Sequence, residues 1–160
     1  MDKGSEILLA YTLRNTRVAA LATLRDDAPR VSMVAYVVAP DFSAFYIHLS
    51  KLAQHTVDMQ KNKNVGFMVS ETDDGRADPQ TLVRLSVRGT AGLISPGEPG
   101  YTPIKELYLN HFPESLRLFD FDDFNLWRVI PKGARYVAGF AKAFNLTVES
   151  LQKASLRSHD

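Results

Sequence analysis

Short apolar segments separated by tight turns fill the first half of the chain. Val18–Thr23 has the composition of a buried strand, and the polar run Arg25–Pro29 after it is typical of a hairpin turn. A second strand is expected from Arg30 to about Val38 and a third from Ala44 to His48, with a turn at Pro40–Ser43 between them. Two hairpins in succession predict an antiparallel meander.

The second half of the chain continues this alternation of strands and turns. A long strand is expected from Thr81 to Ile94, and Gly89 and Gly92 within it indicate a bulge or a sharp bend, as barrel corners require. The other strands expected here are Val65–Val69 and a last hairpin of Phe124–Ile130 and Arg135–Val137 that turns at Pro131–Gly133. The sum is a mainly β fold of six to seven strands with α insertions, in which closure into a small antiparallel barrel would protect the strand edges.

Helices are expected between these strands and at both ends of the chain. Apolar residues near helical spacing predict a short amphipathic helix over about 5–14. Thr102 followed by Pro103 is typical of a helix start, with a hydroxyl at the cap and proline at the first helical position. The other expected helices are one from Ser50 to about Asn62 and a short final one that Thr147 caps.

Composition limits the class of protein. The chain has 160 residues, 45% of them hydrophobic, so we expect a single domain over 1–160 with a helical segment at about 5–14 and a short C-terminal helix and tail at about 147–160. The 19 Lys and Arg residues against 18 Asp and Glu give no electrostatic case for nucleic acid or an anionic membrane as main partner. The absence of cysteine excludes disulfides and thiol catalysis. No signal peptide or bilayer-spanning apolar run is visible, so the expected location is cytoplasmic.

The junction between the third strand and the helix after it carries a group of polar residues. Ser50 and Lys51 fall at the expected first turn of the helix, and His55 and Thr56 fall on the next turn. The first turn of a helix presents unpaired backbone N–H groups and a partial positive charge. A phosphate group is therefore expected to bind at this corner.

Two strands allow both a structural and a functional interpretation. Arg30–Tyr36 is fairly apolar on both faces, so it is either a strand buried on both faces or a strand whose exposed backbone faces a flat ligand. Arg84 and Arg88 lie four residues apart on the long strand and share one face. That face lies against solvent or turns two guanidinium groups toward a phosphate or a carboxylate.

No motif identifies a catalytic group or a metal site. None of the 4 histidines has a metal-ligand spacing with another histidine or with a pair of carboxylates. His111 is expected to be structural, whereas both roles stay open for His55 because it shares a junction with Ser50 and Lys51. No Gly-x-Ser-x-Gly motif or glycine-rich phosphate loop is present, and the acidic run Asp120–Asp123 lacks the spacing of a calcium loop.

These segments, in this order, resemble the flavin-binding split-barrel family that includes pyridoxamine 5'-phosphate oxidase. The resemblance covers the chain from about Thr12 to about Leu146. The form Ser-x-Leu-Ala-x-His-Thr at Ser50–Thr56, together with segments 123–131 and 139–141, looks most like the branch that includes haem-utilisation proteins. The other matching pieces are Ala19–Thr23, Pro29–Ser32, Tyr46–Thr56, Asn62–Val69 and Arg84–Gly89.

The resemblance implies a homodimeric antiparallel split barrel that binds FMN between its two subunits. By position, the strand residues that would line the flavin ring through their backbone are Arg30, Val31, Ser32, Met33 and Val34. Ser50–Leu52 match the family's phosphate-binding Ser-Arg-Lys run, in which Leu52 lacks the second cation. His55 and Thr56 come from the branch pattern and would replace that donor, and Arg84 lies over a family Gln that contacts flavin.

The sequence departs from the oxidase itself where the family holds its substrate. The Lys that ends the oxidase's Arg-x-Val-Leu-Leu-Lys run is replaced by Ala35. The Arg and His of the oxidase's C-terminal Trp-Gln-Gly…Arg-Leu-His run are missing at 137–139 and 143–145. We therefore expect an FMN-dependent oxidoreductase acting on an unidentified small molecule, and not a pyridoxamine 5'-phosphate oxidase.

Two other functions stay open from the sequence. One is a haem-binding or haem-degrading protein, although the longer haem-utilisation relatives carry a haem-ligating His in an additional C-terminal segment, whereas His159 here is a lone residue in the tail. The other is a non-catalytic flavin-binding module. No residue stands out as an acid or a base, so no catalytic residue and no metal site are predicted.

Overall fold

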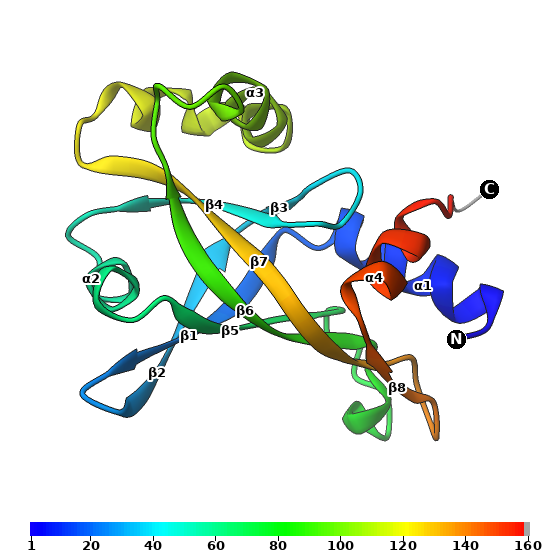
Figure 1. Cartoon of the computed structure of the whole chain (residues 1–160). Helices are drawn as coiled ribbons and strands as arrows, with labels where there is room; N and C mark the ends of the chain where they lie inside the picture. Colours follow the sequence, from blue (N-terminus) through cyan, green and yellow to red (C-terminus); the bar gives the residue numbers. More distant parts are fainter. Residues whose placement is uncertain (159–160) are drawn as a thin grey trace.

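The computed structural model describes residues 1–158, which form a curled β-sheet with helices at its ends and over part of one face (Figure 1). The strands are β1 (Val18–Arg25), β2 (Ala28–Ala35), β3 (Val37–Val38), β4 (Phe45–Ser50), β5 (Asn64–Ser70), β6 (Arg84–Ile94), β7 (Phe124–Val137) and β8 (Ala143–Leu146). The helices are α1 (Lys3–Asn15), α2 (Gln54–Lys61), α3 (Tyr101–His111) and α4 (Val148–Ser155), with 3-10 segments η1 (Pro79–Thr81) and η2 (Pro113–Asp120). His159, discussed above as a tail residue, lies outside the described residues.

The strands pair antiparallel in the order β2-β1-β5-β6-β7-β4-β3, and β8 pairs with β7. β2 and β3 are the two ends of this path. The sheet curls until β2 approaches β4, but these two strands do not pair, so the barrel stays split (Figure 1). The predicted mainly β fold with an antiparallel split barrel is confirmed.

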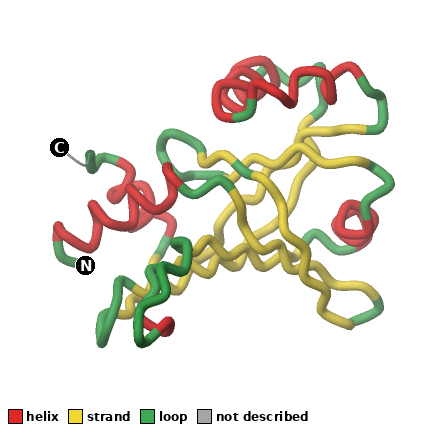
Figure 2. The backbone as a smooth tube through the Cα atoms, turned by 180° about the vertical axis from the view of Figure 1, so that it is seen from behind, coloured by secondary structure: helices red, strands yellow, loops and turns green. Residues whose placement is uncertain are grey.

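Helices close both ends of the half-barrel. α2 lies at one end, and α1 and α4 lie together at the other, as Figures 1 and 2 show from opposite sides. The carboxylate of Glu6 on α1 is buried and lies 2.8 Å from Nε of Arg157 and 3.1 Å from Nζ of Lys153. Thr147 caps α4, as predicted, because its hydroxyl accepts a hydrogen bond from the amide of Ser150.

Aromatic rings fill the centre of the half-barrel. Tyr36, Phe45 and Phe67 are almost fully buried, and the closest pair of ring centroids, Phe45 and Phe67, is 4.9 Å apart. The Tyr36 hydroxyl donates to the carbonyl of Leu13 and so fastens α1 to this core. A second apolar cluster lies on the other face of β4 and β7, under α3 and η2. α3 and η2 therefore cover this second face of β4 and β7.

The start of the helix expected from Ser50 is wrong by four residues. β4 continues to Ser50, Lys51–Ala53 form a turn, and α2 begins at Gln54. The strand expected from Arg30 to Val38 is also divided, because β2 pairs with β1 whereas the two residues of β3 pair with β4. In both places strand pairing, which is a tertiary contact, decides where the element ends.

The start of α3 and the last hairpin also differ from the prediction. α3 begins at Tyr101 after Gly100, so Thr102 lies inside the helix and does not cap it. β7 passes through Pro131–Gly133 without a turn, and the chain reverses only after Val137 to form β8. A Pro-x-Gly run is typical of turns, but here a bulge accommodates it within one strand.

The bulge in β7 depends on a glycine in the neighbouring strand. Gly89 of β6 pairs with Pro131, and the preceding Arg88 pairs with Gly133, so Lys132 is the extra residue. A Cβ atom at Gly89 would lie 2.6 Å from a carbonyl oxygen of β7, a contact that only glycine avoids. The bulge predicted at the glycines of the long strand is therefore confirmed at Gly89.

Candidate cofactor-binding site

The predicted phosphate-binding corner lies where β4 gives way to α2. Ser50 is the last residue of β4, and α2 begins at Gln54 after Ala53, an N-cap without a side-chain acceptor. Within residues 1–158, the backbone amides of Gln54 and His55 have no hydrogen-bond acceptor. The start of α2 therefore presents free N–H donors together with the positive end of a helix dipole.

Two residues of α2 carry buried polar atoms that lack a partner. Thr56 is 0% exposed, and among the described residues neither its hydroxyl nor Nε2 of His55 has a hydrogen-bond partner. Burial lowers the pKa of His55, so the neutral ring has one nitrogen donor and one nitrogen acceptor. A buried polar group without a partner costs about 1–3 kcal/mol, so a ligand that bonds to these atoms gains affinity by satisfying them.

A buried ion pair holds α2 on β1. Asp58 is 1% exposed, and its carboxylate accepts hydrogen bonds from Nε of Arg25 at 2.6 Å and from the Thr23 hydroxyl at 2.9 Å. Burial alone would raise the pKa of Asp58, but these two hydrogen bonds and the positive charges near the carboxylate together lower the pKa. The positive charge of Arg30 on β2 acts in the same direction. Arg30 forms no ion pair within residues 1–158, so its charge is available to a ligand beside α2.

An acidic residue also lies at this corner. The Ser50 hydroxyl donates to Oδ2 of Asp123 at 3.2 Å, and the Lys51 amide donates to the backbone carbonyl of Asp123 at 2.6 Å. The Ser50 oxygen in turn accepts from the Leu52 amide at 3.1 Å. The hydroxyl predicted to bind phosphate is thus engaged with a carboxylate, which would repel an anion placed next to it.

The outer face of β2 is exposed and apolar. Val31 and Met33 are 72% and 74% exposed, and Met68 of β5, in the same row of the sheet as Met33, is 41% exposed. Between them lies a shallow groove of about 340 Å³ lined by Val18, Ala19, Ala20, Val31, Ser32, Met33, Met68 and Ser70. The alternative of a strand buried on both faces is therefore wrong for β2.

The other residues of the predicted ring-binding segment face the inside of the half-barrel. Arg30 pairs with Thr23, which bonds to α2, and Ser32 pairs with the fully buried Leu21. Val34 is 3% exposed and lies on the same face. The five predicted residues are thus divided between the two faces of β2. Because β2 is an edge strand, half of its backbone donors and acceptors have no strand partner.

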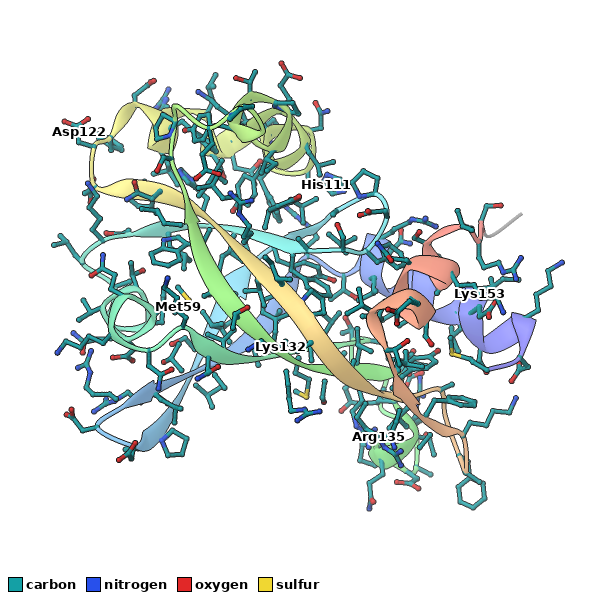
Figure 3. The ribbon with its side chains drawn as sticks, viewed as in Figure 1. Met59, His111, Asp122, Lys132, Arg135 and Lys153 are labelled. Atoms are coloured by element: carbon teal, nitrogen blue, oxygen red, sulfur yellow. The ribbon has the colours of Figure 1, made fainter. Side chains whose placement is uncertain are left out.

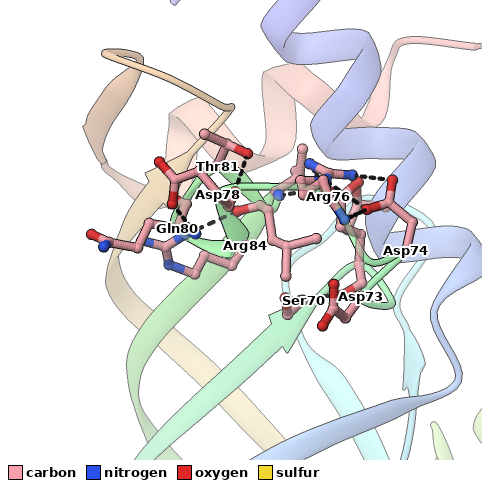
Figure 4. Close-up of polar contacts among 12 residues, drawn as sticks. Ser70, Asp73, Asp74, Arg76, Asp78, Gln80, Thr81 and Arg84 are labelled. Carbon is pink, nitrogen blue, oxygen red and sulfur yellow. Dashed lines mark hydrogen bonds and ion pairs between the residues drawn. The ribbon is translucent and has the colours of Figure 1, made fainter.

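Arg84 lies apart from the corner within one chain. Arg84 pairs with Val137, the last residue of β7, whereas Ser50 pairs with Phe124, the first. These two ends of β7 are separated by roughly 40 Å along the strand. Nη1 of Arg84 donates to the carbonyls of Gln80 at 2.8 Å and Leu82 at 3.0 Å, and Figure 4 shows its side chain beside η1. The structure therefore brings together Ser50–Thr56 and Arg30 but does not add Arg84 to them.

Sequence reasoning missed three residues that shape the corner: Arg25, Asp58 and Asp123. Arg25 and Asp123 fall in segments that the sequence assigns to a turn and to an acidic loop, and no pattern marks Asp58. The packing of α2 against β1, and of the turn before β7 against the end of β4, brings them to the site. Such contacts between distant segments leave no signal in a single sequence.

Two further features of residues 1–158 are the placement of their metal-ligating side chains and the length and apolarity of their helices. No three His, Asp or Glu side chains of this part of the chain are placed to hold a metal ion. No helix in the described range is long and apolar enough to cross a membrane. His111, predicted to be structural, is exposed on α3, and its Nδ1 lies 3.1 Å from the carbonyl of Leu107.

The curled antiparallel sheet with an unpaired edge between β2 and β4 defines the fold class of this chain as a split barrel. Residues 8–138 match the sequence profile of the family described as pyridoxamine 5'-phosphate oxidase, and the chain belongs to this family. A curated relative, the non-canonical heme oxygenase HOZ, chloroplastic, of Arabidopsis thaliana, is 33% identical over 116 residues, or 72% of this chain and 34% of the relative. The chain thus spans about a third of that relative's length.

Solved structures share the fold. A heme binding protein from Mycobacterium smegmatis superposes with a TM-score of 0.83 at 19% identity, over 96% of this chain and 62% of the other. ChuZ of Campylobacter jejuni superposes with a TM-score of 0.79 at 23% identity, over 92% and 61% of the two chains. The resemblance to the split-barrel family and to its haem-utilisation branch, stated from sequence motifs, is confirmed.

Proposed function

We propose that this protein binds FMN between two copies of the chain and is a cytoplasmic oxidoreductase that acts on a small molecule. The observation that carries the proposal is that the edge strand β2 has an exposed apolar groove on its outer face and the cationic corner at the start of α2 on its inner side. A flavin has a flat, largely apolar ring and a phosphate tail. The apolar face of β2 matches the ring, and the corner at the start of α2 matches the phosphate. FMN would supply the electron transfer.

The phosphate would lie at the start of α2. Its oxygens would accept from the free amides of Gln54 and His55, and Arg30 would add a cation from β2. Leu52 would contribute only backbone atoms to this site, because its side chain has no polar group. The side chains proposed to contact the phosphate are Ser50, Lys51, His55 and Thr56. The fit rests on the buried, unpartnered atoms of His55 and Thr56, which an anion with several acceptor oxygens could satisfy.

The flavin ring would lie along β2. The backbone of residues 30–34 would bond to its polar edge, because one side of this edge strand has no strand partner. Val31 and Met33 would cover one face of the ring from the outer side of the sheet. The protein would thus position the ring and keep water from one of its faces.

A second copy of the chain would complete the site. The accessible surface of the chain is 8966 Å², whereas a compact monomer of 17.9 kDa exposes about 8,000 Å². The larger accessible surface and the exposed apolar residues of β2 favour a homodimer that forms through the outer face of β2. Arg84 of the second copy could then reach a ligand that Arg84 of the same chain, at the far end of β7, cannot reach.

Haem binding is a second candidate, with haem degradation as a further step. It is favoured by the 33% identity to a relative named as a heme oxygenase and by the exposed apolar face, which would also accept a flat tetrapyrrole. A non-catalytic flavin-binding module is the third. The three differ in what they bind and in whether the bound group turns over.

The deciding experiment is the absorbance spectrum and mass of the small molecule that co-purifies with the full chain, followed by titration with FMN and with haem. We expect flavin absorbance bands and one FMN per subunit. Reduction of the bound flavin by a nicotinamide cofactor with turnover would distinguish an oxidoreductase from a non-catalytic module. A Soret band on adding haem, without FMN binding, would replace the flavin proposal by the haem one.

A further inference from the structure

The bulge in β7 gathers three cations around a second hollow on the outer surface of the sheet. This hollow of about 560 Å³ lies between β6, β7, β8 and the start of α4. Its cationic lining residues are Arg88 of β6 and Lys132 and Arg135 of β7. Figure 3 shows Lys132 and Arg135 along the same half of β7. The hollow contains none of the residues proposed for the FMN site.

The bulge explains why these cations share one surface. Lys132 and Arg135 are three positions apart, and in a regular strand residues at that spacing point to opposite faces. Lys132 is the extra residue of the bulge, which re-aims its side chain, and both residues line the hollow. Arg88 pairs with Gly133, two positions from Arg135, so it lies on the same face as Arg135.

The charges around the hollow are not balanced by the protein. Within residues 1–158, none of the three cations forms an ion pair, and Nη1 of Arg135 bonds at 3.1 Å to the neutral side-chain oxygen of Asn145. Nη2 of Arg88 would lie 3.7 Å from a Cβ at Gly133, so the missing side chain leaves room beside this guanidinium. Glu149 is the single carboxylate among the lining residues, so three cations minus one anion leave a charge of +2.

We propose that this hollow binds a small molecule through a phosphomonoester group. A phosphomonoester carries a charge of about −1.5 to −2 at neutral pH and three strong acceptor oxygens, which match the net charge and the three cations. Two arginines supply paired N–H donors to phosphate oxygens, and Lys132 supplies a point charge. Ser50 pairs with the first residue of β7, whereas Arg88 at the hollow pairs with Gly133 near the other end of this strand. The two sites are therefore separate within one chain.

The test is a titration of the full chain with inorganic phosphate at constant ionic strength, followed by amide NMR. We expect saturable shifts at Ser86, Gly133 and Asn145. Arg88→Gln and Arg135→Gln should each weaken this binding about tenfold or more, since each removes a charge-assisted hydrogen bond. Arg117→Gln, which removes an exposed arginine from η2, is the matched control and should leave the affinity unchanged.

A further variant and a second anion test whether phosphate binds specifically in the hollow. Lys132→Glu changes an exposed side chain at the bulge. We expect it to abolish the phosphate-induced shifts in the hollow without loss of thermal stability. It therefore tests the proposal even if an arginine variant fails to fold. Succinate at equal concentration should bind more weakly than phosphate. Phosphate shifts confined to Ser50–Thr56, shifts in the hollow that persist in the variants, or tighter binding of succinate would each overturn the proposal. The same spectra report the two sites separately, so failure at the hollow leaves the FMN proposal standing.

Discussion

The hydroxyl of Ser50 donates a hydrogen bond of 3.2 Å to a carboxylate oxygen of Asp123, a residue 73 positions further along the chain. This contact places a negative charge at the corner proposed to hold a phosphate. Two unit anions 4 Å apart repel each other by about 1 kcal/mol in bulk water, and by more where the protein lowers the effective dielectric constant. Asp123 therefore limits how tightly the corner can hold an anion.

Asp123→Asn should strengthen FMN binding by roughly fivefold, the change that about 1 kcal/mol produces. Binding of riboflavin, which lacks the phosphate, should not change. Both affinities can be measured by quenching of flavin fluorescence. Asp122→Asn, at an exposed neighbouring carboxylate, is the control. Equal or weaker FMN binding by Asp123→Asn would show that the phosphate lies elsewhere.

Lys51→Glu should weaken FMN binding at least tenfold, because an attractive charge at the corner becomes a repulsive one. The loss should again be absent for riboflavin. Lys63→Glu reverses another exposed lysine, directly before β5, and should have no effect. Full flavin occupancy in purified Lys51→Glu would contradict the assignment of the phosphate.

Thr56→Val should separate ligand binding from stability. The Thr56 hydroxyl is buried without a partner, so its replacement by a methyl group should leave the thermal unfolding temperature unchanged or higher. FMN binding should weaken, and Thr56→Ser, which keeps the hydroxyl, should retain it. A loss of stability with unchanged FMN affinity would mean that the hydroxyl serves the fold only.

Asp58→Asn should destabilise the protein by about 2 kcal/mol at neutral pH, because it removes the charge that pairs with Arg25 in a buried place. The folded protein holds the pKa of Asp58 below its ordinary value of 3.8, so its contribution is fully present above that value. The contribution is lost as the pH falls through the lowered pKa, and the two proteins should then unfold at the same urea concentration. Asp27→Asn, in the exposed β1–β2 turn, is the control, and a difference that persists in acid would argue against the ion pair.

Met33→Asp should convert the expected dimer to a monomer. Met33 is 74% exposed on the apolar outer face of β2, and a charge there would be buried without a partner in a dimer. Sedimentation at micromolar concentration measures the change. Leu156→Asp, at another exposed apolar residue that is 81% exposed, should leave the dimer intact. A wild-type monomer under the same conditions would contradict a site built between two copies.

Local patterns predicted much of the fold because they depend on neighbours in the sequence. The hairpin between β1 and β2, the cap of α4 by Thr147 and the bulge at Gly89 all follow from residues within a few positions of one another. The same local logic failed at Pro131–Gly133, where a typical turn sequence is held within a strand by its pairing with β6. It also failed at Ser50, because pairing with β7 extends β4 to that residue.

The sequence alone determined the split-barrel family and the polar segment Ser50–Thr56, since motif order and residue type are written along the chain. Only the tertiary structure decided what surrounds that segment. It buried Asp58 against Arg25 and brought Asp123 to Ser50. It also placed Arg84 opposite the last residue of β7 and placed Lys132 and Arg135 around one hollow. The physical reason is that hydrogen bonds and charges act over a few ångströms of space, whereas these partners are mostly tens of residues apart in sequence.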